Sequence, residues 1–369
     1  MPTRRKILTI LFPLVLILVL SLGIAGCGEP EEPAPDEPAP DPGGEEEVYE
    51  LSLAHFQPST HEVETILIQD WIDEIEEATD GRVQITSYPG GTLVEGPEII
   101  EAIVDGVADI GHSAYAYTRG RFPVIETLLV PGLYWDNAKV ADWTAMEFIE
   151  ELEPEELEDV KHLFSFTTGR GDLLSQEPVR SMEDLSGLEI GVTAGERADA
   201  LERLGSTGNV MPMPDQYEAI QRGLTDGTIA PMETLKSFRI AEVVDYVTET
   251  PMMYNQVLFM IMNQETWDSF PPDIQETIEE VNKEYYEEVV AGFYDWLSFD
   301  LVYEWLEEEG IELEYIELDE EEEERWVEEI EPLYDEHIEY LNEQGFPGEE
   351  VFDTAMKLIE ENREKYGDN

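Results

Sequence analysis

The chain of 369 residues has little cysteine, little positive charge and few histidines. A single cysteine, Cys27, excludes an internal disulfide. Only 20 Lys and Arg stand against 87 Asp and Glu, a formal net charge of −67, which excludes nucleic acid as a partner because phosphate groups need a basic surface. The five histidines are scattered, and the common nucleophile, zinc and nucleotide motifs are missing. We therefore expect no enzyme, no cofactor and no metal site.

The excess of acidic residues predicts a salty environment. Self-repulsion of this size destabilises a compact chain in dilute buffer. It is tolerable in concentrated salt, where the Debye length falls to about 3 Å near 1 M. We expect a halophilic or haloalkaliphilic host, and the alternative is an acidic protein from an ordinary habitat.

The first 47 residues have the composition of an export signal followed by a tether. The signal comprises three bases, an apolar run and small residues before the cysteine: Arg4, Arg5, Lys6, Ile7–Leu20 and Ile24-Ala25-Gly26. We expect residues 1–26 to be removed and Cys27 to be lipidated at the outer face of the cytoplasmic membrane or in the periplasm. Residues 27–47, rich in Pro, Glu and Asp, have no apolar face and predict a disordered tether. An uncleaved membrane helix is the alternative.

Hydrophobic periodicity predicts a βαβαβ order at the start of the globular body. We expect strands at 49–55, 83–88 and 108–113, with helices over 63–78 and 97–104 between them. Ser59 and Glu62 have the spacing of a capping box for the first helix. This order implies a parallel sheet covered by helices.

The second half repeats the pattern and ends in helices. We expect strands at 188–192, 210–211 and 228–230, helices at 196–204 and 216–222, and then helices at 320–342 and 349–366. The motif E-A-I-x-x-G-x-x-D occurs at 101–109 and again at 218–226, which favours two similar lobes. Residues 273–309 contain no breaker except Gly292, and a continuous helix there would span roughly 55 Å and brace both lobes.

The order and spacing of several short segments resemble the extracytoplasmic solute-binding proteins of tripartite ATP-independent periplasmic (TRAP) transporters, the DctP-like group. No single segment is specific, but the series covers residues 54–270. The segments are Gly81-Arg82-Val83, Tyr88-Pro89-Gly90-Gly91, Val107-Ala108-Asp109-Ile110-Gly111, residues 178–185, Gly187-Leu188-Glu189-Ile190, Met211-Pro212-Met213-Pro214, Tyr217-Glu218-Ala219, Thr225-Asp226-Gly227 and residues 267–272.

The resemblance implies a two-lobed α/β fold of the periplasmic-binding-protein type, with hinge strands and a long C-terminal helix bridging the lobes. Lobe 1 would comprise 48–168 plus 255–270, lobe 2 would comprise 169–254, and residues 271–369 would brace both. A ligand would be clamped between the lobes and delivered to membrane permease subunits.

The sequence departs from the family at its ligand-binding arginines. The family usually places an arginine after the G-L-x-I segment, to grip the ligand carboxylate, and here that position is Gly191. A second family arginine falls near Gly171, with Arg170 beside it. The carboxylate clamp is therefore either moved or lost.

Charge distribution points to the second lobe as the side that binds an anion. Residues 161–239 hold 8 bases against 12 acids, whereas the rest of the chain is strongly acidic, unless this difference is chance. Arg170 lies between two glycines and is suited to bidentate carboxylate binding, or it is a surface arginine paired with Asp172. Thr193 precedes a helix whose amides can hold an anion, or it belongs to an ordinary loop.

The remaining candidates follow strand ends. Aromatic side chains there can stack on a ligand, or they pack under loops. The candidate ligand-binding residues are Phe56, Ser113, Tyr115, Tyr117, Arg170, Gly191, Thr193, Met232, Glu233 and Asn255. Together these features predict a protein that binds a small organic acid, such as an aromatic or keto acid, and passes it to a TRAP permease. A sensor lipoprotein and a secreted enzyme are the alternatives.

Overall fold

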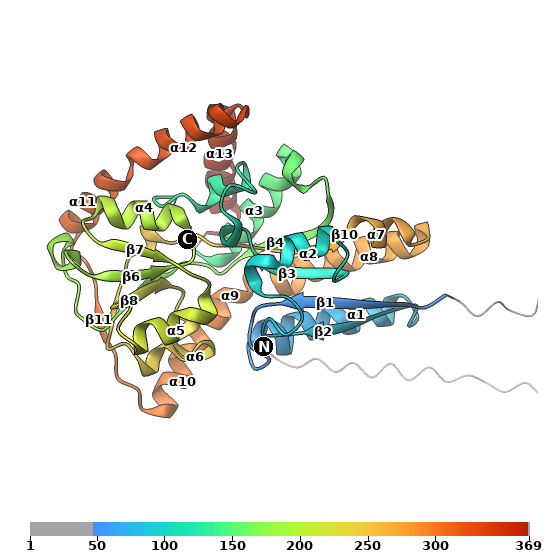
Figure 1. Ribbon diagram of the computed structural model, residues 1–369, viewed down its shortest axis with the longest axis horizontal. Coiled ribbons are helices and arrows are strands. Elements are labelled where there is room, and N and C mark those ends of the chain that lie inside the picture. Colours follow the sequence, from blue (N-terminus) through green and yellow to red (C-terminus); the bar gives the residue numbers. More distant parts are fainter. Residues whose placement is uncertain (1–46, 134, 368–369) are drawn as a thin grey trace, which may run out of the picture. The chain divides into compact units, whose positions relative to one another are not determined.

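The computed structural model describes residues 47–133 and 135–367 (Figure 1). Two sheets organise this part of the chain, as the sequence predicted. The first has the order β2-β1-β3-β10-β4, with bounds Tyr49–His55 (β1), Val83–Tyr88 (β2), Ile110–Ala114 (β3), Val160–Thr167 (β4) and Val257–Asn263 (β10). Strand β1 runs parallel to β2 and β3, which confirms the βαβαβ prediction, and β10 runs antiparallel to β3 and β4.

The second sheet has the order β11-β9-β5-β8-β6-β7. Its strands are Asp172–Ser175 (β5), Glu189–Val192 (β6), Thr207–Val210 (β7), Gly227–Ala230 (β8), Tyr246–Thr248 (β9) and Glu314–Ile316 (β11). Strand β11 pairs parallel with β9 and comes from a region for which the sequence predicted only helices. We call the first sheet with the helices that cover it lobe 1, and the second sheet with its helices lobe 2. The exact domain boundaries predicted above stay predictions.

Amphipathic helices cover the sheets. In lobe 1 they are α1 (Gln69–Ala78), α2 (Ile99–Val104) and α3 (Ala138–Leu152), and in lobe 2 they are α4 (Gly195–Arg203), α5 (Met213–Gln221) and α6 (Thr234–Ser237). Helix α1 buries Trp71, Ile72 and Ile75 because these residues share one face at helical spacing. The core of lobe 2 joins Ile190 and Ile229 from the sheet to Leu201 of α4.

The predicted capping box at Ser59 and Glu62 is wrong. A turn closed by the His61 amide donating to the Pro58 carbonyl oxygen (2.9 Å) precedes the helix. The helical segment before α1, a π-helical stretch over Val63–Ile68, starts after Glu62, whose side chain caps nothing. Glu62 instead forms an ion pair with Lys236 of lobe 2.

The predicted long helix is interrupted at Gly292. Helix α8 (Pro272–Tyr285) continues through a π-helical turn, Tyr286–Val290, and the chain then adopts a positive φ of 91° at Gly292, which glycine tolerates. Short helix α9 (Phe293–Asp295) follows, then a π-helical stretch, Trp296–Leu301, and α10 (Val302–Glu309).

The two halves of this interrupted segment contact different lobes. On the lobe 1 side, the indole nitrogen of Trp71 on α1 donates to Asn282 of α8 at 2.9 Å. Helix α10 packs against α6 of lobe 2. The segment therefore bridges the lobes, as the resemblance implied, but as two pieces.

The C-terminal helices are α11 (Glu320–Ile330), α12 (Pro332–Gln344) and α13 (Gly348–Tyr366). The helix predicted over 320–342 is divided because Pro332 has no amide hydrogen to continue the first helix. Helix α11 packs on α4 and α13 packs on α3, so these helices contact both lobes. Short α7 (Gln264–Ser269) precedes α8. Within the described ranges, no helix combines the length and apolar character needed to cross a membrane.

Candidate binding site between the lobes

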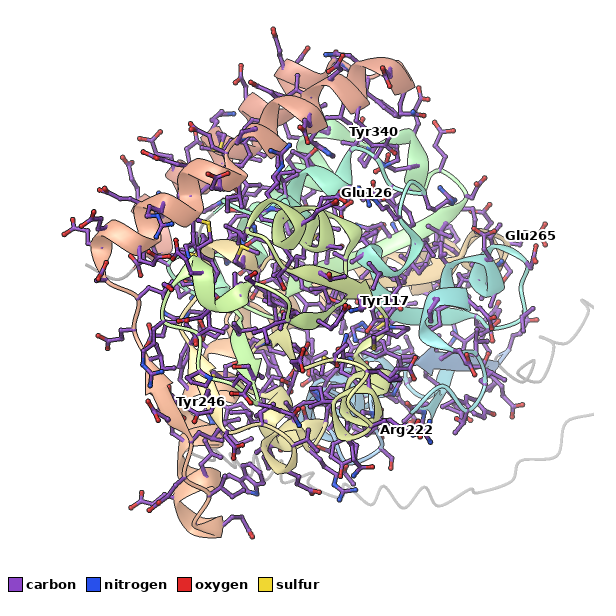
Figure 2. The ribbon with its side chains drawn as sticks, turned by 60° about the vertical axis from the view of Figure 1, so that its left-hand side comes forward. Tyr117, Glu126, Arg222, Tyr246, Glu265 and Tyr340 are labelled. Carbon is purple, nitrogen blue, oxygen red and sulfur yellow. The ribbon has the colours of Figure 1, made fainter. Side chains whose placement is uncertain are left out.

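A cavity of about 30 Å³ lies between the two lobes, and we call it the interlobe cavity. Its lining comes from residues that follow β1, β3, β6 and β8, from α5, α6 and α9, and from the segments that cross between the lobes. The lining residues are Phe56, Gln57, His61, Tyr117, Thr168, Thr193, Met213, Pro231, Glu233, Thr234, Phe238, Tyr254, Gln256, Leu258 and Tyr294. Tyr117 lies among the central side chains in Figure 2. This cavity is small, so we expect side chains or lobes to move when an organic acid enters.

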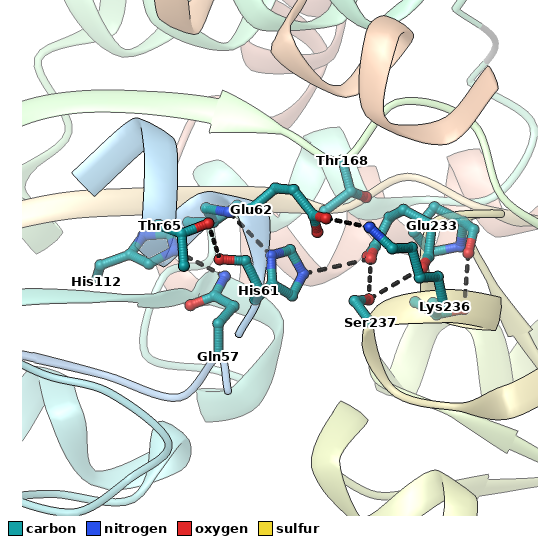
Figure 3. A network of polar contacts seen from close by, with 12 residues as sticks. Gln57, His61, Glu62, Thr65, His112, Thr168, Glu233, Lys236 and Ser237 are labelled. Atoms are coloured by element: carbon teal, nitrogen blue, oxygen red, sulfur yellow. Dashed lines mark hydrogen bonds and ion pairs between the residues drawn. The ribbon is translucent and has the colours of Figure 1, made fainter. Parts of the chain in front are cut away.

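Polar contacts hold the lobes together around the cavity (Figure 3). The Nε2 atom of His61 lies 3.3 Å from Glu233 of lobe 2, beside the ion pair of Glu62 with Lys236. The Met213 amide donates to the Tyr117 hydroxyl oxygen at 3.1 Å. These contacts join lobe 1 to lobe 2, so we infer that opening the lobes would break them.

Arg197 is the buried cation next to this cavity. It lies in the first turn of α4, is 0% exposed, and its guanidinium sits 4.3 Å from the Tyr254 ring. It donates from Nη1 to the Thr193 hydroxyl at 2.6 Å, and from Nη2 to Gln256 Oε1 at 2.7 Å and to the Asn255 carbonyl oxygen. Thr193, Tyr254 and Gln256 line the cavity, so Arg197 lies directly behind its wall.

The charge of Arg197 is not balanced by a carboxylate at short range. Throughout 47–133 and 135–367, no ion pair joins Arg197 to an acidic residue, and its Nε atom has no hydrogen-bond partner. Burial lowers the pKa of Arg197, and the charges of Tyr254 and the neighbouring Glu196 oppose this shift only in part. A buried cation that forms no ion pair is costly for folding, so its presence favours a role in binding an anion.

The two positions where the resemblance implied arginines are filled by other side chains. A Cβ atom at Gly191 would overlap Oε1 of Gln216, which is fully buried. A Cβ atom at Gly171 would overlap the ring of Tyr254. Neither position can hold an arginine unless a neighbouring side chain moves. One of these neighbours, Tyr254, has the ring against which the guanidinium of Arg197 packs. This arrangement favours a clamp that has moved to Arg197.

Arg170 lies away from the interlobe cavity. Its guanidinium is 3.1 Å from Glu249 and 3.5 Å from Asp172, and it faces the ring of Phe299 at 5.9 Å. The pairing with Asp172 is the alternative that the sequence left open. A ligand-binding role for Arg170 stays a prediction, to be tested against Arg197.

The other predicted site residues divide into two groups. Phe56, Tyr117, Thr193 and Glu233 line the interlobe cavity, and the Phe56 and Tyr117 rings meet edge to face with centroids 5.2 Å apart. The remaining candidates are outside the described lining. Ser113 donates to the Gly96 carbonyl oxygen at 2.8 Å, Tyr115 bonds Ser165 at 3.1 Å, Met232 is in the hydrophobic core, and the Asn255 side chain donates to the Val130 and Leu133 carbonyl oxygens.

Sequence reasoning missed several lining residues and Arg197 itself. One signal was available, because Arg197, Ala200, Leu201 and Leu204 follow the i, i+3, i+4, i+7 spacing of a buried helix face. A charged residue on an apolar stripe indicates a cation placed inside the protein. The turn that brings His61 to the cavity had no comparable signal.

A larger cavity, about 230 Å³, lies beside Arg119 and is a poor site for an anion. Its lining places Glu126, Glu196, Asp199 and Glu336 against that single arginine, with Tyr340 near Glu126 in Figure 2. Burial and the neighbouring Glu196 raise the pKa of Glu126 to about 7. In the described part of the chain, no group of His, Cys, Asp and Glu side chains is arranged to hold a metal ion.

Two α/β lobes that close over a small cavity of aromatic and polar side chains define a solute-binding protein. The chain belongs to bacterial extracellular solute-binding protein family 7, the DctP family, whose model matches residues 53–340. Members of this family are extracytoplasmic receptors for solutes.

The relatives include solute-binding proteins, and the structural neighbours include TRAP solute-binding proteins. The sialic acid-binding periplasmic protein SiaP of Vibrio cholerae is 23% identical over 72% of this chain and 81% of its own length. A solute-binding protein of Roseobacter denitrificans is 24% identical, and the match spans 56% of this chain and 64% of that protein. A TRAP protein of Bordetella bronchiseptica with bound mandelate has a TM-score of 0.76 and 26% identity, covering 85% of this chain and 99% of that one.

Proposed function

We propose that this protein binds a small organic acid outside the cytoplasm and delivers it to the membrane subunits of a TRAP permease, without converting it. The observation that carries the proposal is Arg197, a buried cation with no carboxylate partner behind the wall of an aromatic cavity between two lobes. The relatives named above, which bind sialic acid and mandelate, support an acid as cargo.

A melting scan with candidate acids in concentrated salt tests this function. An acid present at about 100 times its dissociation constant stabilises the folded state by about 2.7 kcal/mol, so the melting temperature is expected to rise by several degrees. Mass spectrometry of the sample should recover that acid unchanged. Chemical turnover of a stabilising acid, or the lack of a shift with aromatic, keto, sugar and dicarboxylic acids alike, would contradict the proposal.

We also propose that Cys27 carries a lipid that keeps the protein at the membrane. Cys27, the signal over 1–26 and the tether over 27–47 fall in the part of the chain outside the described residues, except for Glu47. A lone cysteine after small residues supports the assignment.

Replacing Cys27 with serine is expected to move the protein from the membrane fraction to the soluble fraction, because the thiol that takes the lipid is lost. Immunoblots of the two fractions measure this. Ser21→Ala, directly after the apolar run, is the matched control and should stay in the membrane fraction. Retention of Cys27→Ser in the membrane would instead indicate an uncleaved helix.

A further inference from the structure

The orientation of Gln57 leaves a hydrogen-bond acceptor at the interlobe cavity. Atom Nδ1 of His112 bonds the Phe259 carbonyl oxygen at 2.9 Å, and a carbonyl only accepts, so Nδ1 carries the proton. Burial lowers the pKa of His112 to about 3, so the ring is neutral and Nε2 accepts. The group 2.9 Å from Nε2 must therefore be the Gln57 amide nitrogen. The other amide atom, Gln57 Oε1, is buried with no hydrogen-bond partner in the described residues.

A second acceptor, Glu233, lines the same cavity and is 3% exposed. His61 Nδ1 accepts from the Val63 amide at 3.0 Å, so His61 presents Nε2–H toward Glu233 and is a neutral partner. Ser237 also donates to Glu233. Lys236 is paired with Glu62, and no lysine or arginine of the described chain forms an ion pair with Glu233 (Figure 3). Glu233 is thus a buried carboxylate without a cation.

The rest of the lining suits a positively charged group. Five aromatic residues line the cavity together with His61: Phe56, Tyr117, Phe238, Tyr254 and Tyr294. Aromatic faces attract cations, most strongly where water is excluded. The lining itself contains no lysine or arginine. Among the described residues, Glu233 lines the cavity without an ion pair to a lysine or arginine, and Arg197 lies behind the cavity wall without an ion pair to a carboxylate. Both lie near the wall residue Tyr254, whose pKa is raised by burial: Arg197 contacts its ring and lowers that pKa, whereas Glu233 raises it.

We propose that the ligand is a zwitterion: a small carboxylic acid that also carries a protonated, N–H-bearing nitrogen, such as an ammonium or amidinium group. This inference rests on the proposed function and narrows its substrate class. The ligand carboxylate faces Arg197, and the nitrogen donates to Glu233 and to Gln57 Oε1. Each buried charge then gains the partner that the protein itself does not supply.

Calorimetry with matched acids tests the inference on the whole chain in concentrated salt. Cyclohexanecarboxylate is compared with piperidine-2-, 3- and 4-carboxylate, which have the same ring but one NH₂⁺ in place of a CH₂. We expect at least one piperidine acid to bind about tenfold tighter than the carbocycle, in the range of a buried charge pair. Equal or tighter binding of cyclohexanecarboxylate overturns the inference and leaves the proposed function intact. Binding only by other acids that lack nitrogen also overturns it, and failure of every acid overturns both proposals.

Glu233→Gln tests whether Glu233 binds the ligand nitrogen. The variant is expected to bring the two affinities within about twofold by weakening the piperidine acid alone, because the neutral amide keeps the shape but not the charge. Glu62→Gln is the matched control. It removes a carboxylate that lies between the same two lobes but does not line the cavity, and it should leave the ratio of the two affinities unchanged. If Glu62→Gln lowers the ratio equally, the preference arises from lobe closure, and the role of Glu233 is overturned. The wild-type comparison stands even if Glu233→Gln fails to fold.

Discussion

Replacing Arg197 with methionine is expected to weaken organic-acid binding by on the order of 100-fold while leaving the free protein as stable as the wild type, or more stable. Truncating one partner of a buried charge pair typically costs about 2–5 kcal/mol of affinity. Replacing a fully buried side chain usually destabilises the folded protein, and here we expect the opposite. Arg197 is fully buried and forms no ion pair with a carboxylate of the described residues, and an apolar side chain of similar length removes a desolvation cost.

Calorimetry with a stabilising acid and melting curves of the free protein measure the two effects. Arg170→Met is the matched control, because Arg170 is held by Glu249 and Asp172 away from the interlobe cavity. We expect it to keep acid affinity within about threefold, because neither Arg170 nor its two partners line the cavity. Loss of binding in Arg170→Met with retention in Arg197→Met would instead restore the sequence prediction for Arg170. An Arg197→Met protein that melts several degrees lower would assign Arg197 a structural role.

Lowering the salt concentration is expected to destabilise the protein strongly. A formal net charge of −67 repels itself over about 10 Å at 0.1 M salt but over only about 3 Å at 1 M. Exposed ion pairs such as Lys357 with Glu151 offset little of this, since such pairs contribute about 0–1 kcal/mol. We infer from this balance that the protein works in concentrated salt.

Melting curves from low to high concentrations of NaCl and KCl measure this effect. The melting temperature should rise steeply and similarly for both salts, because screening depends on ionic strength and not on the cation. Sucrose, which favours compact states without screening charge, is the control and should recover only a small part of the rise. A melting temperature that is flat across the salt range would contradict the inference.

Much of the fold could be predicted from the sequence, because the apolar residues of buried faces recur with a fixed period. Strand β1 and the βαβαβ order follow from alternation and helical spacing between Tyr49 and Ala114. Strand β11 was not predictable, because Glu314–Ile316 has only one buried residue and owes its conformation to pairing with β9. The break at Gly292 also depends on tertiary contacts, since the Gly292 amide donates to the buried carboxylate of Asp142 at 2.8 Å.

The binding site was harder to predict from the sequence, because its residues lie mostly in turns. Phe56, Tyr117, Thr193 and Glu233 follow strands, and the rule that strand ends meet at the cleft found them. Gln57 and His61 lie in an irregular turn whose path is set by packing against the other lobe. The charge window contained Arg197 among eight bases, and only burial separates it from the others.

The interruption at Gly292 changes how the two lobes can move. A single rod attached to both lobes would have to bend whenever the cavity opens. Here α8 is anchored to lobe 1 through Trp71, and Asp295, just past Gly292, still accepts from the Ala138 and Lys139 amides of lobe 1, whereas α10 packs on lobe 2. Opening can be absorbed by rotation about backbone bonds in the π-helical stretch between Asp295 and α10. Ligand entry therefore need not bend one continuous helix.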